Sequence, residues 1–349
     1  MKFIQSAIFV MLLANSLAAA QPGVYGNNGV VVAHTQQACD AGIEILQAGG
    51  NAVDAAVAVS YALAVSHPQA GNIGGGGFML IQMADGQSVA IDFREMAPGN
   101  ATRDMFLDDS GKVVPGKSVK GGLAVGVPGT VAGLQLALDK YGSLSRKKVM
   151  KPAIRIAQKG FEIPYHLAYS FGWLNQSAAG FDETRRIFCR NGELYMPGDL
   201  FKQPDLAKTL KLIQKHGNAG FYSGKVAEAL VKSNLQYGGT ISLEDLKNYK
   251  PVIRKPVTGN YRGFEVLSMP PPSSGGIALI SMLNMLEPMH FDSIGWHSAQ
   301  HIQLLAEVEK RAYADRSVWL ADPDYFDIPQ EKLLSKAYAY YRMADYDSL

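Results

Sequence analysis

Cysteine and charged residues are both scarce in this 349-residue sequence. It has two cysteines, and Asp, Glu, Lys and Arg together make up 18% of its residues. Two cysteines are too few for a disulfide framework or a cysteine-rich zinc site. The 33 basic and 31 acidic residues give a net charge of +2, which argues against a nucleic-acid-binding protein with a concentrated basic face. Apolar residues make up 47% of the sequence, which is enough for a sizeable core and disfavours disorder.

The first 20 residues have the pattern of a secretory signal peptide. Lys2 provides a positive start, residues 3–17 form a short apolar run, and residues 18–20 are three alanines of the size that a signal peptidase requires. The run is shorter than the ~20 apolar residues of a membrane span, and no second run approaches that length. We therefore expect residues 1–20 to be removed and residues 21–349 to act outside the cytoplasm, with no membrane span.

Hydrophobic periodicity near the mature N-terminus predicts one strand and two helices. Residues 29–34, which include three consecutive valines, predict a buried strand, and residues 36–47 predict an amphipathic helix. Asn51 is expected to cap a second helix, because Asp54 follows it in capping-box spacing. This second helix is apolar nearly all round and should be buried, and His67 with the following proline should end it.

The remainder of the sequence predicts a mixed α and β protein. Strands are expected over residues 78–83, 87–94, 252–261 and 264–269, and helices over residues 130–141, 148–159, 206–215, 225–236, 275–286, 297–320 and 330–344. No linker rich in proline and serine divides the mature chain. We therefore expect one large domain of the α/β class.

Four of the seven residues in the run 71–77 are consecutive glycines (GNIGGGG). Glycine permits close approach of a ligand or of another backbone segment. The run could therefore form an anion-binding nest of backbone N–H groups, or it could permit tight packing beneath an active site. Its spacing matches neither a P-loop nor a dinucleotide-binding loop, and it precedes a strand, so nucleotide binding is disfavoured.

Arg94 is the most suggestive single residue, because it stands at the end of the predicted strand 87–94. A rigid strand end can present the guanidinium fork to a carboxylate, which accepts two parallel hydrogen bonds from it. The alternative is an ion pair with Asp92 or Glu95. Spacing alone favours that ion pair, since most surface arginines do no more.

Three further features have structural explanations that we prefer to catalytic ones. Ser274 lacks the G-x-S-x-G context of a nucleophile elbow, because position 272 is proline, and residues 270–276 are expected to form a rigid turn whose serines cap the following helix. His297 and His301 have the spacing of metal ligands, but no H-E-x-x-H glutamate lies between them, which disfavours a zinc site. A charged face or a buried ion-pair network is expected further along the same helix, from residues Glu307, Glu309, Asp315 and Arg316.

Six stretches of the sequence resemble motifs of the γ-glutamyltransferase (glutathione hydrolase) family of N-terminal-nucleophile hydrolases. They occur in the family's order and extend over nearly the whole mature chain. They are residues 49–54 (GGNAVD), 67–78 (HPQAGNIGGGGF), 92–98 (DFREMAP), 127–133 (VPGTVAG), 268–276 (SMPPPSSGG) and 312–317 (AYADRS). The close similarity to bacterial members, together with the signal peptide, suggests a periplasmic or secreted enzyme.

The resemblance implies a four-layer αββα sandwich and a precursor that cleaves itself into a large and a small subunit. It implies γ-glutamyl transfer from glutathione and other γ-glutamyl compounds to water, an amino acid or a peptide, without cofactor or metal. A threonine attacks the γ-amide carbonyl, and its own freed α-amine acts as general base. The arginine of the family's D-F-R-E motif holds the substrate's α-carboxylate, and this role carries over to Arg94.

One departure from the family pattern is large. The family's nucleophile heads the small subunit in a motif beginning Thr-Thr-His-Tyr, which this sequence does not contain. The chain is therefore expected to be a large-subunit portion that supplies the scaffold and the carboxylate clamp, as one part of a heterodimer, and to be inactive alone. Two alternatives stay open: a related acylase acting on glutaryl-type amides, and a non-catalytic secreted protein that binds γ-glutamyl compounds on the same scaffold.

Overall fold

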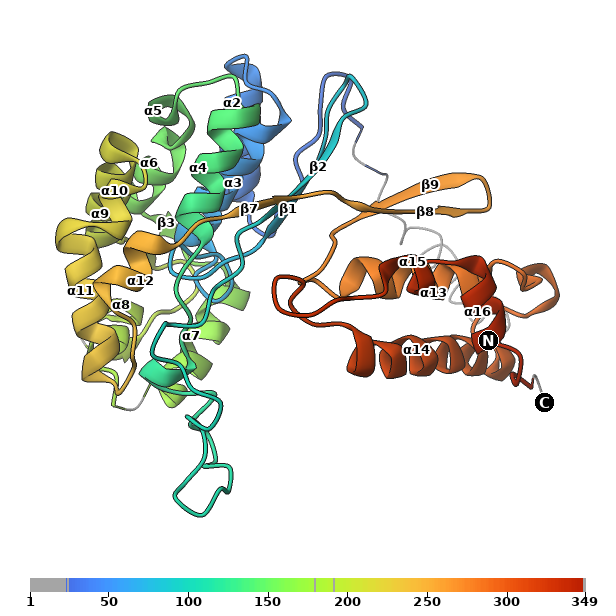
Figure 1. The fold of residues 1–349 in the computed structure, drawn as a ribbon. Coiled ribbons are helices and arrows are strands. Elements are labelled where there is room, and N and C mark those ends of the chain that lie inside the picture. The colour runs from blue at the N-terminus through green and yellow to red at the C-terminus, as the bar shows by residue number, and fades with distance from the viewer. Residues whose placement is uncertain (1–22, 24, 179, 191, 348–349) are drawn as a thin grey trace, which may run out of the picture.

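A computed structural model describes residues 23, 25–178, 180–190 and 192–347 (Figure 1). The predicted signal peptide, residues 1–20, lies outside this part of the chain. Within the described part, no helix has both the length and the apolar character needed to cross a membrane.

A three-stranded antiparallel sheet lies beside the larger of two groups of helices (Figure 1). Its strands, in the order β1-β2-β7, are β1 (Phe78–Gln82), β2 (Ser88–Asp92) and β7 (Val252–Arg254). One face carries side chains such as Ile91, which is fully buried in the same core cluster as residues of the helices. The opposite face is less covered, because Leu80 on it is 43% exposed.

The larger group of helices shares one hydrophobic core with this sheet. The group also contains two short antiparallel strand pairs. Its elements are α2 (Gln36–Gln47), α3 (Ala52–Ser66), η1 (Gly122–Ala124), α4 (Thr130–Tyr141), α5 (Arg146–Val149), α6 (Lys151–Lys159), β3 (Phe161–Glu162), α7 (Tyr165–Ser177), α8 (Asp182–Phe188), β4 (Cys189–Arg190), β5 (Glu193–Leu194), β6 (Leu200–Phe201), α9 (Pro204–His216), α10 (Ala219–Tyr222), α11 (Gly224–Gln236) and α12 (Leu243–Asn248).

The C-terminal part of the chain forms the second group (Figure 1). It contains the hairpin of β8 (Val257–Tyr261) and β9 (Phe264–Ser268), then α13 (Gly275–Leu286), η2 (Phe291–Ser293), α14 (Ala299–Trp319), α15 (Gln330–Leu333) and α16 (Lys336–Arg342). Two small core clusters hold this part together: one joins the hairpin to α13 and α15, and the other joins α13 to α14 and α16.

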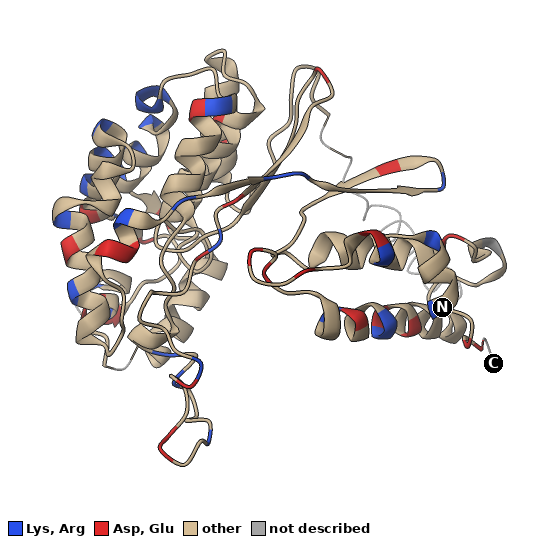
Figure 2. Cartoon of the chain, in the orientation of Figure 1, with Lys and Arg blue, Asp and Glu red and all other residues tan. Residues whose placement is uncertain are grey.

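Charged residues of both signs occur in both groups of helices (Figure 2). All charged residues of the helices α5 and α6 are basic. One of them, Arg155, forms an ion pair with Glu44 of the neighbouring helix α2 at 2.5 Å. This mixture of signs agrees with the small net charge of the sequence.

The predicted α/β class is confirmed, and so are most of the elements that local signals mark clearly. The helices expected over 36–47, 130–141 and 275–286 have the predicted bounds. At the start of α3, the Asn51 side chain accepts hydrogen bonds from the backbone N–H groups of Val53 and Asp54. The Asp54 carboxylate accepts the backbone N–H of Asn51 in return, which completes the predicted capping box. These signals succeed because capping and amphipathic periodicity act within a few residues of sequence.

Two strand predictions are wrong. Residues 29–34 form no strand, and Val32 is 88% exposed, because no described segment pairs with them. The strand expected over 252–261 is divided into β7 and β8 at Pro256, which has no backbone N–H to donate to a ladder. Sequence analysis also missed the helices α7 and α8.

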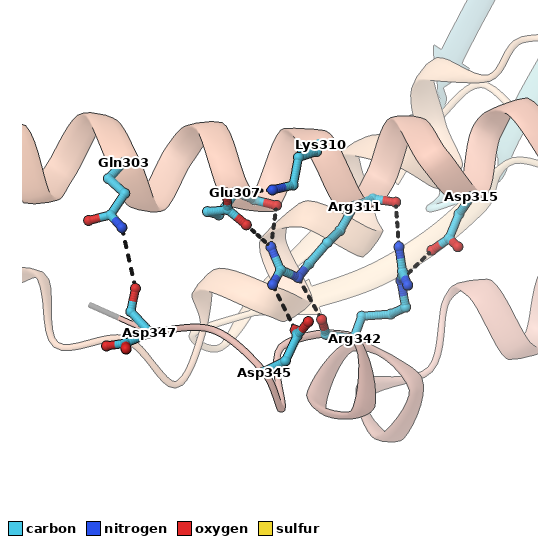
Figure 3. A network of polar contacts seen from close by, with 8 residues as sticks. All are labelled: Gln303, Glu307, Lys310, Arg311, Asp315, Arg342, Asp345 and Asp347. Carbon is cyan, nitrogen blue, oxygen red and sulfur yellow. Dashed lines mark hydrogen bonds and ion pairs between the residues drawn. The ribbon is translucent and has the colours of Figure 1, made fainter. Parts of the chain in front are cut away.

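The ion-pair network predicted on the helix α14 (Ala299–Trp319) is confirmed for Glu307 and Asp315, and it joins α14 to α16 and the segment after it (Figure 3). Arg316 instead donates a hydrogen bond to the hydroxyl of Ser274. The guanidinium of Arg311, 9% exposed, pairs with Glu307 on its own helix and with Asp345, 2.7 Å away. Its Nε also donates to the backbone carbonyl of Arg342 at 2.7 Å. The Arg342 side chain in turn lies 3.3 Å from the carboxylate of Asp315.

Replacing Arg311 with alanine is expected to destabilise the C-terminal part by about 2 kcal/mol, because a largely buried group with several hydrogen bonds is removed. The measurement is the midpoint of thermal unfolding at a fixed scan rate. Lys310→Ala is the matched control. The Lys310 side chain is 69% exposed, so its ion pair with Glu307 should contribute little to stability. Equal midpoints for the two variants would contradict the prediction.

Candidate functional site

Arg94 lies just beyond the end of β2, on the wall of a cavity of about 320 Å³. The cavity is lined by residues from three segments, 92–96, 249–254 and 321–324, and by Pro272. The first two belong to the sheet and its extensions, and the third follows α14. The cavity therefore lies where the C-terminal part of the chain meets the end of the sheet.

Side chains fix the backbone of Arg94 on both sides. Its N–H donates to the carboxylate of Asp92 at 3.1 Å, and its carbonyl accepts a hydrogen bond from the hydroxyl of Tyr249 at 2.8 Å. One residue earlier, Phe93 exchanges two backbone hydrogen bonds with Gly77, which extends the pairing of β1 and β2. The backbone that carries Arg94 is thus held by hydrogen bonds on both sides, like the strand it continues.

The Arg94 guanidinium, in contrast, is largely free. Among the residues that the structure describes it forms no ion pair, so the pairing with Asp92 or Glu95 that spacing alone favours does not occur. It donates one long hydrogen bond, 3.4 Å, to the carbonyl of Pro272, and it lies 6.0 Å from the ring of Phe78. A fork without a carboxylate partner, exposed in a cavity, is available to an anionic ligand.

The glycine run packs tightly beneath this segment. A Cβ on Gly76 would lie 2.6 Å from the carbonyl oxygen of Phe93, and one on Gly133, in α4, would lie 2.1 Å from the ring of Phe93. The carbonyl of Gly75 accepts hydrogen bonds from the backbone N–H groups of Gly129 and Thr130. The two glycine-containing motifs therefore enclose the backbone next to Arg94, which supports the packing interpretation of the run.

A second arginine in the same cavity, Arg254, is paired with two carboxylates. Nε of Arg254 donates to Asp92 at 2.9 Å, and its two terminal nitrogens donate to the two oxygens of Asp324 at 3.2 and 3.1 Å. Burial would lower the pKa of Arg254, but the hydrogen bonds and charges of Asp324 and Asp92 outweigh it and raise that pKa. The same pairing lowers the pKa of Asp324. Sequence analysis identified neither Arg254 nor Asp324, since nothing in their local context marks them.

The other candidates have structural roles. The prediction that the serines of the turn cap α13 is wrong for Ser274, whose hydroxyl accepts a hydrogen bond from Arg316 at 3.0 Å. The Ser273 hydroxyl accepts the backbone N–H of Gly275, the first residue of α13, at 3.3 Å. Nδ1 of His301 accepts the backbone N–H of His297 at 3.1 Å. No group of three or more potential ligand side chains is arranged for a metal ion in the described part of the chain.

Comparisons with known proteins match one family over most of the chain. A family model described as gamma-glutamyltranspeptidase matches residues 38–348. The glutathione hydrolase proenzyme of Escherichia coli (strain K12) is 49% identical over 319 residues, which are 90% of this chain and 55% of that protein. The acylase ACY 1 proenzyme of Pseudomonas sp. (strain SE83) is 40% identical over 91% of this chain and 58% of its own length. The chain thus spans about half the length of these curated relatives.

Among solved structures, the γ-glutamyltranspeptidase of Helicobacter pylori superposes with a TM-score of 0.90 at 45% identity, covering 93% of both chains. The γ-glutamyltranspeptidase of Pseudomonas nitroreducens, complexed with L-DON, superposes with a TM-score of 0.87 at 39% identity, covering 93% of this chain and 96% of that one.

Proposed function

This chain belongs to the γ-glutamyltranspeptidase family, and we propose that it is the large-subunit portion of an enzyme that transfers γ-glutamyl groups. Donors are glutathione and other γ-glutamyl compounds, and acceptors are water, amino acids or peptides. The observation that carries the proposal is the free guanidinium of Arg94, held by its backbone in a cavity at the end of a sheet. Its fork matches the α-carboxylate of a γ-glutamyl group, which can accept two parallel hydrogen bonds.

Arg94 acts in this proposal by orienting the substrate. With the α-carboxylate fixed, the γ-amide carbonyl is presented at a constant distance from the clamp, which favours attack by a correctly placed nucleophile. A threonine hydroxyl forms an ester with the γ-carbonyl carbon, and the amine leaves with a proton from the threonine's own α-amine. Water or an acceptor amine then attacks the ester and releases the threonine.

We further propose that the threonine belongs to a small subunit produced from the same precursor. The relatives from Escherichia coli, Pseudomonas and Bacillus subtilis are proenzymes, and the Thr-Thr-His-Tyr motif of the family is absent from this sequence. The exposed apolar side chains on one face of the sheet, including Phe78 and Leu80, support a further layer covering that face. Residues 1–20 would be the signal peptide and residues 21–349 the large-subunit region of a periplasmic or secreted heterodimer.

A glutaryl acylase is the second candidate, because an acylase proenzyme is 40% identical to the chain. A glutaryl group also has a terminal carboxylate that Arg94 could bind, so the clamp alone does not separate the two substrates. A non-catalytic binding protein would use the same clamp.

The test uses a complete precursor, defined as this chain joined after Leu349 to the C-terminal part of the Escherichia coli relative that lies beyond the aligned region. We expect it to cleave itself into two subunits and to release nitroaniline from γ-glutamyl-p-nitroanilide but not from glutaryl-p-nitroanilide. The chain expressed alone should release neither, since it has no threonine with a freed α-amine. Release from the glutaryl substrate alone would favour the acylase. Release by the chain alone, abolished by mutating one of its own threonines, would overturn the proposal.

A further inference from the structure

We propose that Arg254 and Asp324 are positioning residues for the Arg94 clamp, acting through the carboxylate that Asp92 shares between the two arginines. The inference rests on the proposed function, in which Arg94 binds the substrate carboxylate. It adds two residues that never touch the substrate but determine where the Arg94 fork lies.

The shared carboxylate is the centre of the arrangement. One oxygen of Asp92 accepts the backbone N–H of Arg94 at 3.1 Å, and the other accepts Nε of Arg254 at 2.9 Å. Asp92 is 7% exposed, and a carboxylate so little exposed to water is held in place by charge-assisted hydrogen bonds. The orientation of the Asp92 side chain, and with it the N–H of Arg94, therefore depends on Arg254.

Arg254 is itself fixed from the other side of the cavity. Its side chain is 14% exposed, and its terminal nitrogens form a two-point contact with Asp324, which is 70 residues away in the sequence. The N–H of Asp324 donates to the side chain of Asp322 at 3.0 Å, which orders the segment after α14. A continuous chain of contacts thus runs from that segment, through two ion pairs, to the backbone of Arg94.

These pairings also leave one arginine of the two for the ligand. Arg254 and Arg94 line the same cavity, and either guanidinium could bind a carboxylate. Because Asp92 and Asp324 together occupy Nε and both terminal nitrogens of Arg254, the substrate carboxylate finds its partner at Arg94. The same contacts therefore position Arg94 and leave it as the arginine that binds the substrate carboxylate.

The test is Asp324→Asn in the complete precursor, because Asp324 is 54% exposed and its replacement should leave the fold intact. The amide keeps the size of the carboxylate but removes the charge that holds Arg254. We expect KM for γ-glutamyl-p-nitroanilide to rise about 3- to 10-fold with kcat, normalised to self-cleaved enzyme, within about 2-fold, since the clamp supplies binding common to ground and transition states. Asp324→Glu should recover most of the affinity. Asp205→Asn is the matched control, because Asp205 pairs with Arg186 and Lys208 on the exposed surface.

A double-mutant cycle separates positioning from a general structural effect. If Asp324 acts through Arg94, then Asp324→Asn should leave kcat/KM unchanged in an Arg94→Ala background, whereas independent effects would multiply. An unchanged KM in the single variant, or a full additional decrease in the double variant, would overturn the inference. The proposed function is tested separately: it fails if the unmutated, self-cleaved precursor has no activity on γ-glutamyl substrates.

Discussion

Replacing Arg94 with alanine in the complete precursor is expected to lower kcat/KM for γ-glutamyl substrates by about 30- to 700-fold. This range corresponds to about 2–4 kcal/mol, the free energy that a charge-assisted pair of hydrogen bonds contributes to the transition-state complex. Most of the effect should appear as a higher KM, because the α-carboxylate keeps its charge throughout the reaction. Arg94→Lys keeps a positive charge but not the fork, so its activity should lie between wild type and Arg94→Ala.

Both variants should still fold and cleave themselves, because the guanidinium forms no ion pair in the described chain and only one long hydrogen bond, to Pro272. Initial rates of nitroaniline release at low substrate concentration measure kcat/KM, and gel electrophoresis reports self-cleavage. Arg103→Ala is the control, because Arg103 is 95% exposed and its ion pair is with the neighbouring Asp104, which is itself 65% exposed. Wild-type kcat/KM in Arg94→Ala would show that the arginine has no part in substrate binding.

The sequence predicts the position of Arg94 but not its surroundings. The alternation of apolar and polar residues along 87–94 indicates a strand that ends at this arginine, and β2 confirms it as far as Asp92. Whether the Arg94 guanidinium pairs with the carboxylate of Asp92 depends on a competing arginine that is distant in the sequence. Arg254, contributed by β7, takes the carboxylate of Asp92 and so leaves Arg94 free.

Long-range pairing also explains two further failures of prediction. The residues 29–34 have the composition of a strand, but a strand exists only with a partner, and no described segment pairs with them. The contact between Arg254 and Asp324 joins residues 70 positions apart, and neither lies in a motif that local spacing would reveal. In contrast, the predicted cap at Asn51 depends on residues within one helical turn, and it is present.

Asp54→Ala is expected to have the largest effect on stability, about 3–5 kcal/mol, because it removes a fully buried carboxylate that serves several donors. Asp54 has no exposed surface. It accepts hydrogen bonds from the backbone N–H groups of Asn51, Ser143 and Leu144 and from the Ser143 hydroxyl, at 2.6–3.1 Å. These hydrogen bonds join the start of α3 to the segment after α4. Alanine would leave the backbone N–H groups of Asn51, Ser143 and Leu144 without this acceptor, and the loss of these hydrogen bonds adds to the cost of removing the carboxylate.

The loss of stability caused by Asp54→Ala should become smaller at low pH. Burial would raise the pKa of Asp54, but the hydrogen bonds from Ser143, Asn51 and Leu144 outweigh it and hold that pKa below its usual value of 3.8. A carboxyl group with a lowered pKa in the folded state stabilises the protein fully above its unfolded pKa and loses that contribution as the pH falls through the folded value. The difference between wild type and Asp54→Ala should therefore be constant above about pH 5 and shrink below about pH 4.

Thermal unfolding of the self-cleaved precursor, followed by circular dichroism at a fixed scan rate between pH 3.5 and pH 8, measures both effects. Asp40→Ala is the matched control, because Asp40 is exposed on α2 and its carboxylate accepts a hydrogen bond from the exposed side chain of Gln36. Its unfolding midpoint should stay close to that of wild type. If Asp54→Ala unfolds at the same temperature as this control, the carboxylate does not join α3 to the segment after α4. If it unfolds earlier by the same margin at every pH, the effect comes from packing rather than from the ionised carboxylate.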